Sequence, residues 1–377
     1  MPVGIICTLE EKALQYRQTR IEVDISKIAD NVRTLCRAMG DVSLLAVVKA
    51  NAYGHGQLRV SETALKAGAK WLGVAIAEEG EYLRENGITA PILVLGGVNE
   101  RGAEASVRHH LTQTVFDVNG VKQLSEAGKK LGLRPQVHIK LDTGMGRIGV
   151  CSKEALSEVL EAIRQAGNID ITGAFTHFAN ADAVDDDYTE KQLERFKAFN
   201  TMLPSGIIRH AAASAALLRY PQTRFDMVRA GIVMYGYAPV EAKISVEPAL
   251  SWKTEIVYIK TVPAGECISY GCTYQTTKPT VVATLPVGYG DGYHRALSGK
   301  AEVLVGGIRC PVLGRVCMDQ MMVDVSAVPN VRIGEEAVLL GRQGNETIDA
   351  EQLAAWANTI PYEILLAASA RVPIIYV

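Results

Sequence analysis

The chain has 377 residues, of which 48% are hydrophobic and 21% charged, and its formal net charge is −2 at pH 7. The length exceeds that of a typical single domain and the composition is that of a globular protein with a substantial core, so we expect two domains. The charge is nearly balanced, and no basic stripe in the sequence suggests a nucleic-acid-binding surface. The sequence holds no apolar run long enough to span a membrane, and residues 1–20 lack the basic start and apolar stretch of a signal peptide.

Short apolar runs typical of buried strands recur through the first two thirds of the chain. There are eight: residues 44–48, 71–75, 92–95, 112–116, 137–141, 171–175, 207–211 and 227–233. Stretches between them, such as residues 153–167, carry apolar residues at every third or fourth position, which predicts amphipathic helices. Strands that alternate with helices predict a parallel sheet with right-handed crossovers. The count of eight favours a (β/α)8 barrel, which is a TIM-like α/β fold, over a doubly wound open sheet.

The pattern changes near residue 240. Residues 239–250 resemble a linker, and the β-branched runs that follow are separated by Gly and Pro turns. We therefore predict a barrel domain over residues 1–245 and a mostly-β domain over residues 246–377, with a final helix at 349–360. The strand-like segment 20–24 precedes a predicted helix at 26–39, and this N-terminal part of the chain is a candidate for the sheet of the β domain.

The seven cysteines are few and scattered: Cys7, Cys36, Cys151, Cys267, Cys272, Cys310 and Cys317. Their number is odd, and no two of them form a C-x-x-C pair. The sequence therefore predicts neither a zinc site nor a disulfide framework, and it fits a reducing cytoplasm.

Polar residues follow several of the predicted strands, at the end of a barrel where catalytic side chains gather. They are Lys49, Lys140, Asp142, Arg147, His177, His210, Ser214 and Arg229. Lys49 could extend its ammonium group from the barrel mouth into water. Alternatively, it is a desolvated amine with a lowered pKa, of the kind that forms a Schiff base with an aldehyde such as that of pyridoxal 5′-phosphate (PLP).

Residues 144–149, GMGRIG, match the pattern G-x-G-x-x-G. The dinucleotide-binding fingerprint requires this pattern to open the first helix after an apolar strand. Here it follows the fifth strand, which carries Lys140. A glycine-rich turn that lets Arg147 approach a ligand explains the motif better than a nicotinamide site.

Eight motifs occur together along the chain: VVKANAYGHG, HIKLDTGMGRIG, THFANAD, VRAGIVMYG, SYG, PVGYGDGYHR, GRVCMDQ and TIPYE. In order and approximate spacing they resemble the motifs of the alanine racemase family, over essentially the whole chain. That resemblance implies a PLP enzyme that interconverts L-alanine and D-alanine and so supplies D-alanine for peptidoglycan. It also implies a homodimer in which the two subunits share their active sites.

The resemblance also implies a role for each residue of the site. Lys49 would hold PLP and act as one catalytic base, and Tyr270 of the partner subunit would act on the opposite face of Cα. His177 would link Tyr270 to Arg229, which would bond the pyridine nitrogen. The residues implied to bind the phosphate are Tyr53, Ser214, Gly231, Ile232 and Tyr362. Arg147 would contact the cofactor and the substrate carboxylate, and Met318 and Asp319 would complete the substrate pocket. Lys140 is a site of possible carbamylation, and Arg295 and Arg315 would line the entrance.

One departure from the family pattern lies close to the expected cofactor. Ala213 stands where the family usually has asparagine, so one polar contact there is lost or supplied elsewhere.

Three other functions remain open. A racemase for another small amino acid such as serine is the nearest alternative, although Tyr362 favours alanine. A non-catalytic PLP-binding barrel would lack the β domain that carries Tyr270 and Met318. A PLP-dependent decarboxylase of related fold is only weakly suggested by the CMD motif at residues 317–319.

Overall fold

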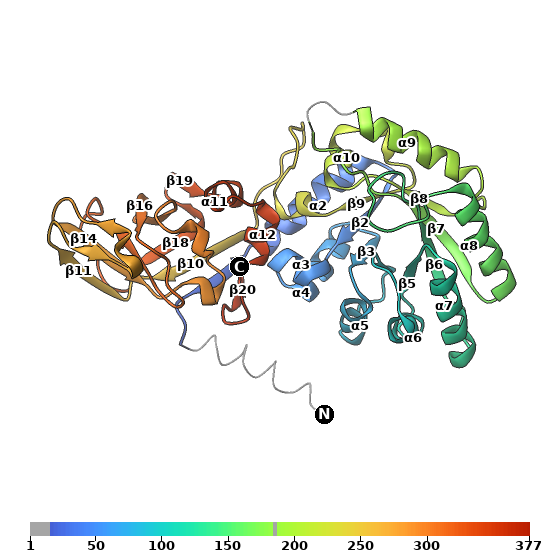
Figure 1. Cartoon of the computed structure of the whole chain (residues 1–377), viewed down its shortest axis with the longest axis horizontal. Coiled ribbons are helices and arrows are strands. Elements are labelled where there is room, and N and C mark those ends of the chain that lie inside the picture. Colours follow the sequence, from blue (N-terminus) through green and yellow to red (C-terminus); the bar gives the residue numbers. More distant parts are fainter. Residues whose placement is uncertain (1–15, 184–186) are drawn as a thin grey trace. The chain divides into compact units, whose positions relative to one another are not determined.

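The computed structural model describes residues 16–183 and 187–377, which form two compact units (Figure 1). The barrel unit contains residues 26–52 and 56–247. The β unit contains the described residues 16–25 together with residues 53–55 and 248–377. The division lies between Glu247 and Pro248, whereas the sequence places it after residue 245.

A parallel sheet of eight strands forms the centre of the barrel unit. The strands are β2 (Ser43–Val47), β3 (Trp71–Val74), β4 (Ile92–Val94), β5 (Thr112–Val115), β6 (Gln136–Lys140), β7 (Asp170–Phe175), β8 (Ile208–His210) and β9 (Met227–Ala230). Their order is β8-β7-β6-β5-β4-β3-β2-β9, so all eight predicted strands are confirmed. The two outer strands are joined by backbone hydrogen bonds from Arg229 N to Ala212 O (3.0 Å) and from Asp226 N to Arg209 O (3.0 Å). These bonds nearly close the sheet into a barrel.

Helices separate successive strands of the barrel, as the apolar periodicity predicts. They are α2 (Ile25–Met39), α3 (Lys49–Gly54), α4 (Gln57–Lys66), α5 (Ala77–Glu85), α6 (Glu100–Arg108), α7 (Val118–Leu131), α8 (Lys153–Ala166), α9 (Asp187–Asn200) and α10 (Ser214–Arg219). Figure 1 shows α5 to α8 lying outside the strands. In α8 the buried residues Leu156, Val159 and Ile163 form one face, and the Ser152 hydroxyl caps the first turn by accepting from Ala155 N (3.1 Å). None of the helices in the described ranges is both long and apolar enough to cross a membrane.

A largely antiparallel sheet of ten strands dominates the β unit. It consists of β1 (Arg20–Val23), β10 (Leu250–Glu255), β11 (Tyr258–Val262), β14 (Thr280–Leu285), β15 (Glu302–Val305), β16 (Ile308–Leu313), β17 (Met321–Asp324), β18 (Glu336–Gln343), β19 (Glu346–Ile348) and β20 (Ile374–Tyr376). Strand β1 pairs with β10 in antiparallel register and with β20 in parallel register. The N-terminal strand predicted at 20–24 is therefore part of this sheet. Helices α11 (Ala350–Ala357) and α12 (Pro361–Leu366) follow β19.

Two features of the β unit differ from the sequence analysis. Residues 53–55, predicted within the barrel domain, belong to the β unit. The reason is close packing on α12, since a Cβ added to Gly54 would lie 2.3 Å from the carbonyl oxygen of Leu365. The second difference is a disulfide between Cys267 and Cys272, whereas the sequence predicted no disulfide framework. A hairpin of β12 (Cys267–Ile268) and β13 (Tyr274–Gln275) brings these cysteines together.

Candidate active site

Lys49 follows β2 directly and begins the short helical turn α3. Four successive residues of this turn, Ala50 to Tyr53, have φ between 51° and 54°, which is the left-handed region. Each such residue costs roughly 1–2 kcal/mol relative to the right-handed form. The Glu79 carboxylate offsets part of this cost by accepting hydrogen bonds from Ala50 N (2.6 Å) and Ala75 N (2.7 Å). Strain that is held in this way is typical of a functional site.

The Lys49 side chain is half-buried among charged groups of the barrel unit. Burial and the positive charge of Arg147 lower the pKa of its amine, and Glu79 opposes the shift. A lowered pKa raises the fraction of neutral amine, which is the form that acts as a nucleophile and as a base.

Arg229 lies inside β9, with 3% of its surface exposed. Its guanidinium donates hydrogen bonds to the carbonyl oxygens of Thr176 (2.8 Å), Ala211 (2.9 Å) and His210 (3.2 Å). Burial and the nearby charge of Arg147 lower its pKa to about 9, so Arg229 stays cationic at neutral pH. The three carbonyl groups fix the guanidinium plane at the mouth of the barrel.

His177 lies beside Arg229, as the resemblance predicts. Its Nδ1 is 3.3 Å from Nη2 of Arg229. Burial and the charges of Arg229, Arg147, Lys140 and Lys49 lower the pKa of His177 to about 3. The imidazole is therefore neutral at pH 7.

The polar chain around Arg229 continues further into the barrel than the sequence analysis predicted. Nη1 of Arg229 is 3.0 Å from Nδ1 of His210, and Nε2 of His210 is 2.9 Å from Nδ1 of His138. Both imidazoles are fully buried, and burial and the charge of Arg229 lower their pKa values, that of His138 to about 3. The available signal was the alternation of side chains along β6, which puts His138 and Lys140 on one face of the strand.

Lys140 is buried at the end of β6, with 2% of its surface exposed, and its amine donates to the carbonyl of Leu141 (3.0 Å). Burial and the charges of Arg229 and Arg147 lower its pKa to about 7, and Asp142 opposes the shift. The Asp142 carboxylate accepts from Gly144 N (2.9 Å) and Gly146 N (3.1 Å). These bonds shape the glycine-rich turn that carries the exposed Arg147.

Ser214, Gly231 and Ile232 come together at the C-terminal ends of β8 and β9. The buried Ser214 hydroxyl accepts a hydrogen bond from Gly231 N (3.0 Å). Gly231 immediately precedes the 3-10 helix η2 (Ile232–Tyr235). A hydroxyl beside the backbone N–H groups that open a helical turn suits an oxyanion such as a phosphate. Ala213 precedes α10 and supplies no side-chain cap to it.

The remaining predicted residues lie in the β unit. The rings of Tyr53 and Tyr362 are 6.0 Å apart, and burial, together with Tyr362, raises the pKa of Tyr53. Tyr270 and Met318 are 71% and 53% exposed. The loop of Tyr270 adjoins residues 315–317, because the Ser269 hydroxyl donates to the carbonyl of Arg315 (2.5 Å) and lies 3.5 Å from Sγ of Cys317.

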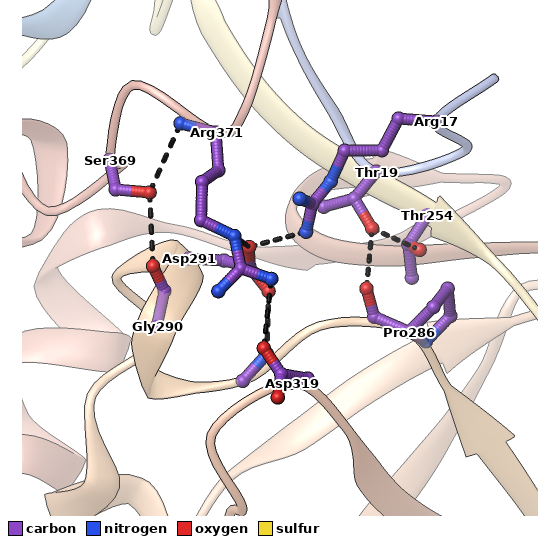
Figure 2. A network of polar contacts seen from close by, with 10 residues as sticks. Arg17, Thr19, Thr254, Pro286, Gly290, Asp291, Asp319, Ser369 and Arg371 are labelled. Atoms are coloured by element: carbon purple, nitrogen blue, oxygen red, sulfur yellow. Dashed lines mark hydrogen bonds and ion pairs between the residues drawn. The ribbon is translucent and has the colours of Figure 1, made fainter. Parts of the chain in front are cut away.

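A polar network holds the segment next to Met318 (Figure 2). Asp291 is fully buried and pairs with Arg17 and Arg371, and Arg371 also donates to Asp319 (2.8 Å). Gly290 N donates to the carbonyl of Met318 (2.8 Å). The motifs around residues 290 and 318 are thus joined in one local structure. Arg295 begins the 3-10 helix η5 (Arg295–Leu297) and Arg315 lies against Gly271.

Known proteins resemble this chain along nearly its whole length. Two family models, described as the N-terminal and C-terminal domains of alanine racemase, match residues 23–239 and 249–376. An alanine racemase of Symbiobacterium thermophilum is 47% identical over 367 residues, which cover 96% of this chain and 97% of that protein.

Solved structures agree with the sequence relatives. The crystal structure of alanine racemase from Bacillus anthracis with bound L-Ala-P is 40% identical, with a TM-score of 0.90 and coverage of 96% of this chain and 95% of that one. A histidine racemase from Leuconostoc mesenteroides subsp. sake is 29% identical, with a TM-score of 0.89 and coverage of 96% and 99%. The chain belongs to the alanine racemase family.

Proposed function

We propose that this protein interconverts L-alanine and D-alanine with PLP held covalently on Lys49. The observation that carries the proposal is the position of Lys49, a half-buried amine with a lowered pKa, in the same barrel unit as the Arg229 guanidinium and the Ser214–Gly231 cradle. The donor set suits each part of PLP. The Lys49 amine suits its aldehyde, the Ser214 hydroxyl and the backbone of Gly231 and Ile232 suit its phosphate, and Arg229 suits its ring nitrogen.

Further contacts are proposed from the resemblance to the family. Tyr53 and Tyr362 add phenolic hydroxyl groups for the phosphate, and His177 packs beside Arg229. Arg147 is proposed to bind both the cofactor and the substrate carboxylate, since a planar guanidinium can donate two parallel hydrogen bonds to a carboxylate.

Bound PLP would supply an electron sink for the pair of electrons left when Cα loses its proton. The Lys49 amine removes or returns a proton on one face of Cα, and its lowered pKa keeps more of it neutral for that role. Arg229 retains its own proton at neutral pH. It therefore donates a hydrogen bond to the ring nitrogen without protonating it, which favours reprotonation of Cα over transamination.

Lys140 is proposed to be carbamylated. Its pKa of about 7 leaves a large share of neutral amine at physiological pH, and only a neutral amine adds to carbon dioxide. The product would be an anion, which relieves the repulsion between Lys140 and the cations Arg147 and Arg229.

Racemisation needs a second proton donor on the opposite face of Cα. We propose Tyr270 of the partner subunit for this role, with Met318 completing the substrate pocket, in a homodimer with shared sites. Subunit exchange between Lys49→Ala and Tyr270→Phe proteins tests this, because one hybrid site would then hold both bases. Recovery of activity is expected, and its absence after proven exchange would reject shared sites.

The proposed cellular role is supply of D-alanine for peptidoglycan in the cytoplasm. Alanine is proposed over larger substrates because, by the resemblance, Tyr362 would narrow the substrate space. Because one structural relative is a histidine racemase, the amino acid that this protein prefers must be tested directly. Turnover of alanine, serine and histidine should be compared, and faster turnover of serine or histidine would reject the assignment.

The deciding experiment is an absorption spectrum and a D-alanine assay of the purified protein and of Lys49→Ala, both supplied with PLP. The wild-type protein should show the absorption of covalently held PLP and should racemise L-alanine, and the variant should lose both. Covalently held PLP without racemisation would instead favour a cofactor-carrying barrel or a decarboxylase, and released carbon dioxide would distinguish the latter.

A further inference from the structure

The loop that carries Tyr270 is crossed by a disulfide. Cys267 and Cys272 are five residues apart in the sequence, with their Cα atoms 5.1 Å apart, and the bond encloses residues 268–271. Both cysteines are exposed. Cys36, Cys151, Cys310 and Cys317 are free. Where most thiols stay reduced, an exposed disulfide is more often a reversible redox element than a structural support.

The two sides of this loop are held unequally. On the N-terminal side, Ile268 is buried in a cluster with Val262, Val282 and Leu313, and the Ser269 hydroxyl donates to Arg315 O (2.5 Å). On the C-terminal side, Gly271, Cys272 and Thr273 are all exposed, and strand pairing resumes only at Tyr274, opposite Ile268. The disulfide therefore ties the exposed side of the loop to the held side.

The backbone of the loop needs such a restraint. Ser269, Gly271 and Cys272 have φ of 68°, 71° and 48°. Positive φ is uncommon for residues other than glycine, so Ser269 and Cys272 favour other conformations once they are released. Tyr270 lies between them and is 71% exposed in the single chain, so contacts within its own chain do little to fix its position.

We propose that Cys267 and Cys272 are a reversible oxidation site that controls the position of Tyr270. In oxidation the two thiols give up two protons and two electrons as the S–S bond forms, and a peroxide takes them up as its O–O bond breaks to give two waters. A dithiol reverses the change by thiol–disulfide exchange. The oxidised loop holds Tyr270 in the observed conformation, and the reduced loop releases it. The consequence for catalysis rests on the proposed role of Tyr270 as the second base.

The first test asks whether the loop changes with redox state. Full-length protein is treated with dithiothreitol or with hydrogen peroxide, and peptide mass mapping identifies the linked cysteines. Amide hydrogen exchange of residues 268–273, measured without substrate, should be slower in the oxidised protein. Cys267→Ser and Cys272→Ser should exchange like the reduced wild type under both treatments. Cys151→Ser, which removes an exposed thiol of the barrel unit, should behave like the wild type.

The second test measures catalysis with PLP supplied. Small displacements of a catalytic group lower rates steeply. The reduced protein should therefore racemise alanine at a rate at least about tenfold lower than that of the oxidised protein. In the reduced protein, Lys49 should still exchange the Cα proton with solvent for the enantiomer whose Cα–H bond faces it. A general loss of folding would abolish this exchange as well.

The outcomes separate the two proposals. Equal racemisation and equal loop exchange in both redox states, or failure of peroxide to link the cysteines, overturns this inference and leaves the proposed function intact. If neither form racemises alanine, the proposed function fails, and the substrate-free hydrogen exchange still decides whether the disulfide controls the loop.

Discussion

His138 makes the stability of the barrel unit depend on pH. Its side chain is fully buried, and burial and the charge of Arg229 lower its pKa to about 3 from the usual 6.5. Below pH 6.5 the unfolded chain therefore binds a proton at this residue that the folded chain does not bind. The neutral His138 therefore contributes to the stability of the folded state, fully above pH 6.5, and this contribution is lost as the pH falls from 6.5 towards 3.

We predict that His138→Asn makes stability less dependent on pH. Between pH 7.5 and pH 5.5 the wild-type protein should lose about 1.4 kcal/mol more free energy of unfolding than the variant, since one pKa unit corresponds to that amount. Asparagine keeps a polar atom near the position of Nδ1, which faces His210. Urea unfolding of both proteins at both pH values measures the difference, and identical pH dependence would contradict the assignment of a neutral buried His138.

The left-handed turn after β2 is the element that presents Lys49. Because Ala50 is exposed and has φ of 51°, its backbone conformation can be tested without disturbing the core. Glycine adopts this region at no steric cost, whereas an L-residue is penalised there.

We predict that an Ala→Gly substitution changes the free energy of unfolding in opposite directions in two helical elements. Ala50→Gly should raise the free energy of unfolding by up to about 1 kcal/mol. Ala198→Gly, at an exposed position of the right-handed helix α9, should lower it by about 1 kcal/mol. Thermal and urea unfolding of the two variants provide the comparison. Destabilisation of similar size at both positions would show that the turn at Ala50 is not left-handed in solution.

Elements with a clear pattern of apolar and polar residues were predictable from the sequence. Elements that depend on contacts between residues far apart in the sequence were not. All eight barrel strands follow from apolar runs alternating with amphipathic helices. The turn at 50–53 could not be predicted, because none of its four residues is glycine and the turn depends on Glu79 from another element. The link between Cys267 and Cys272 depends on a hairpin whose reversal carries no Asn-Gly or Asp-Gly signal.

The candidate site was predicted in the same uneven way. Lys49, His177, Ser214 and Arg229 stand at or near strand ends, and the barrel rule therefore places them together. His138 was missed because a single histidine within an apolar run is indistinguishable from core packing. Tyr53 was placed with the barrel because its grouping with Tyr362 is a contact between residues more than 300 positions apart in the sequence.

At the scale of the whole molecule, the β unit is built from both ends of the described chain. Strand β1 lies between β10 and β20, and Asp291 joins Arg17 to Arg371 (Figure 2). Asp291 also accepts from Gly288 N (3.0 Å). Its carboxylate is fully buried, whereas the side chains of Arg17 and Arg371 are 22% and 46% exposed. The buried carboxylate should therefore contribute more to stability than either arginine.

We predict that Asp291→Asn destabilises the β unit by about 1–3 kcal/mol, because it removes the negative charge that both guanidinium groups face. Arg371→Gln is the matched control and should cost less than about 1 kcal/mol, since an exposed ion pair contributes little. Hydrogen exchange of β1 and β20 reports on this unit specifically, and the amides there should open more readily in Asp291→Asn than in Arg371→Gln. Equal exchange in the two variants would mean that the chain ends are held by strand pairing alone and that the network around Asp291 adds little.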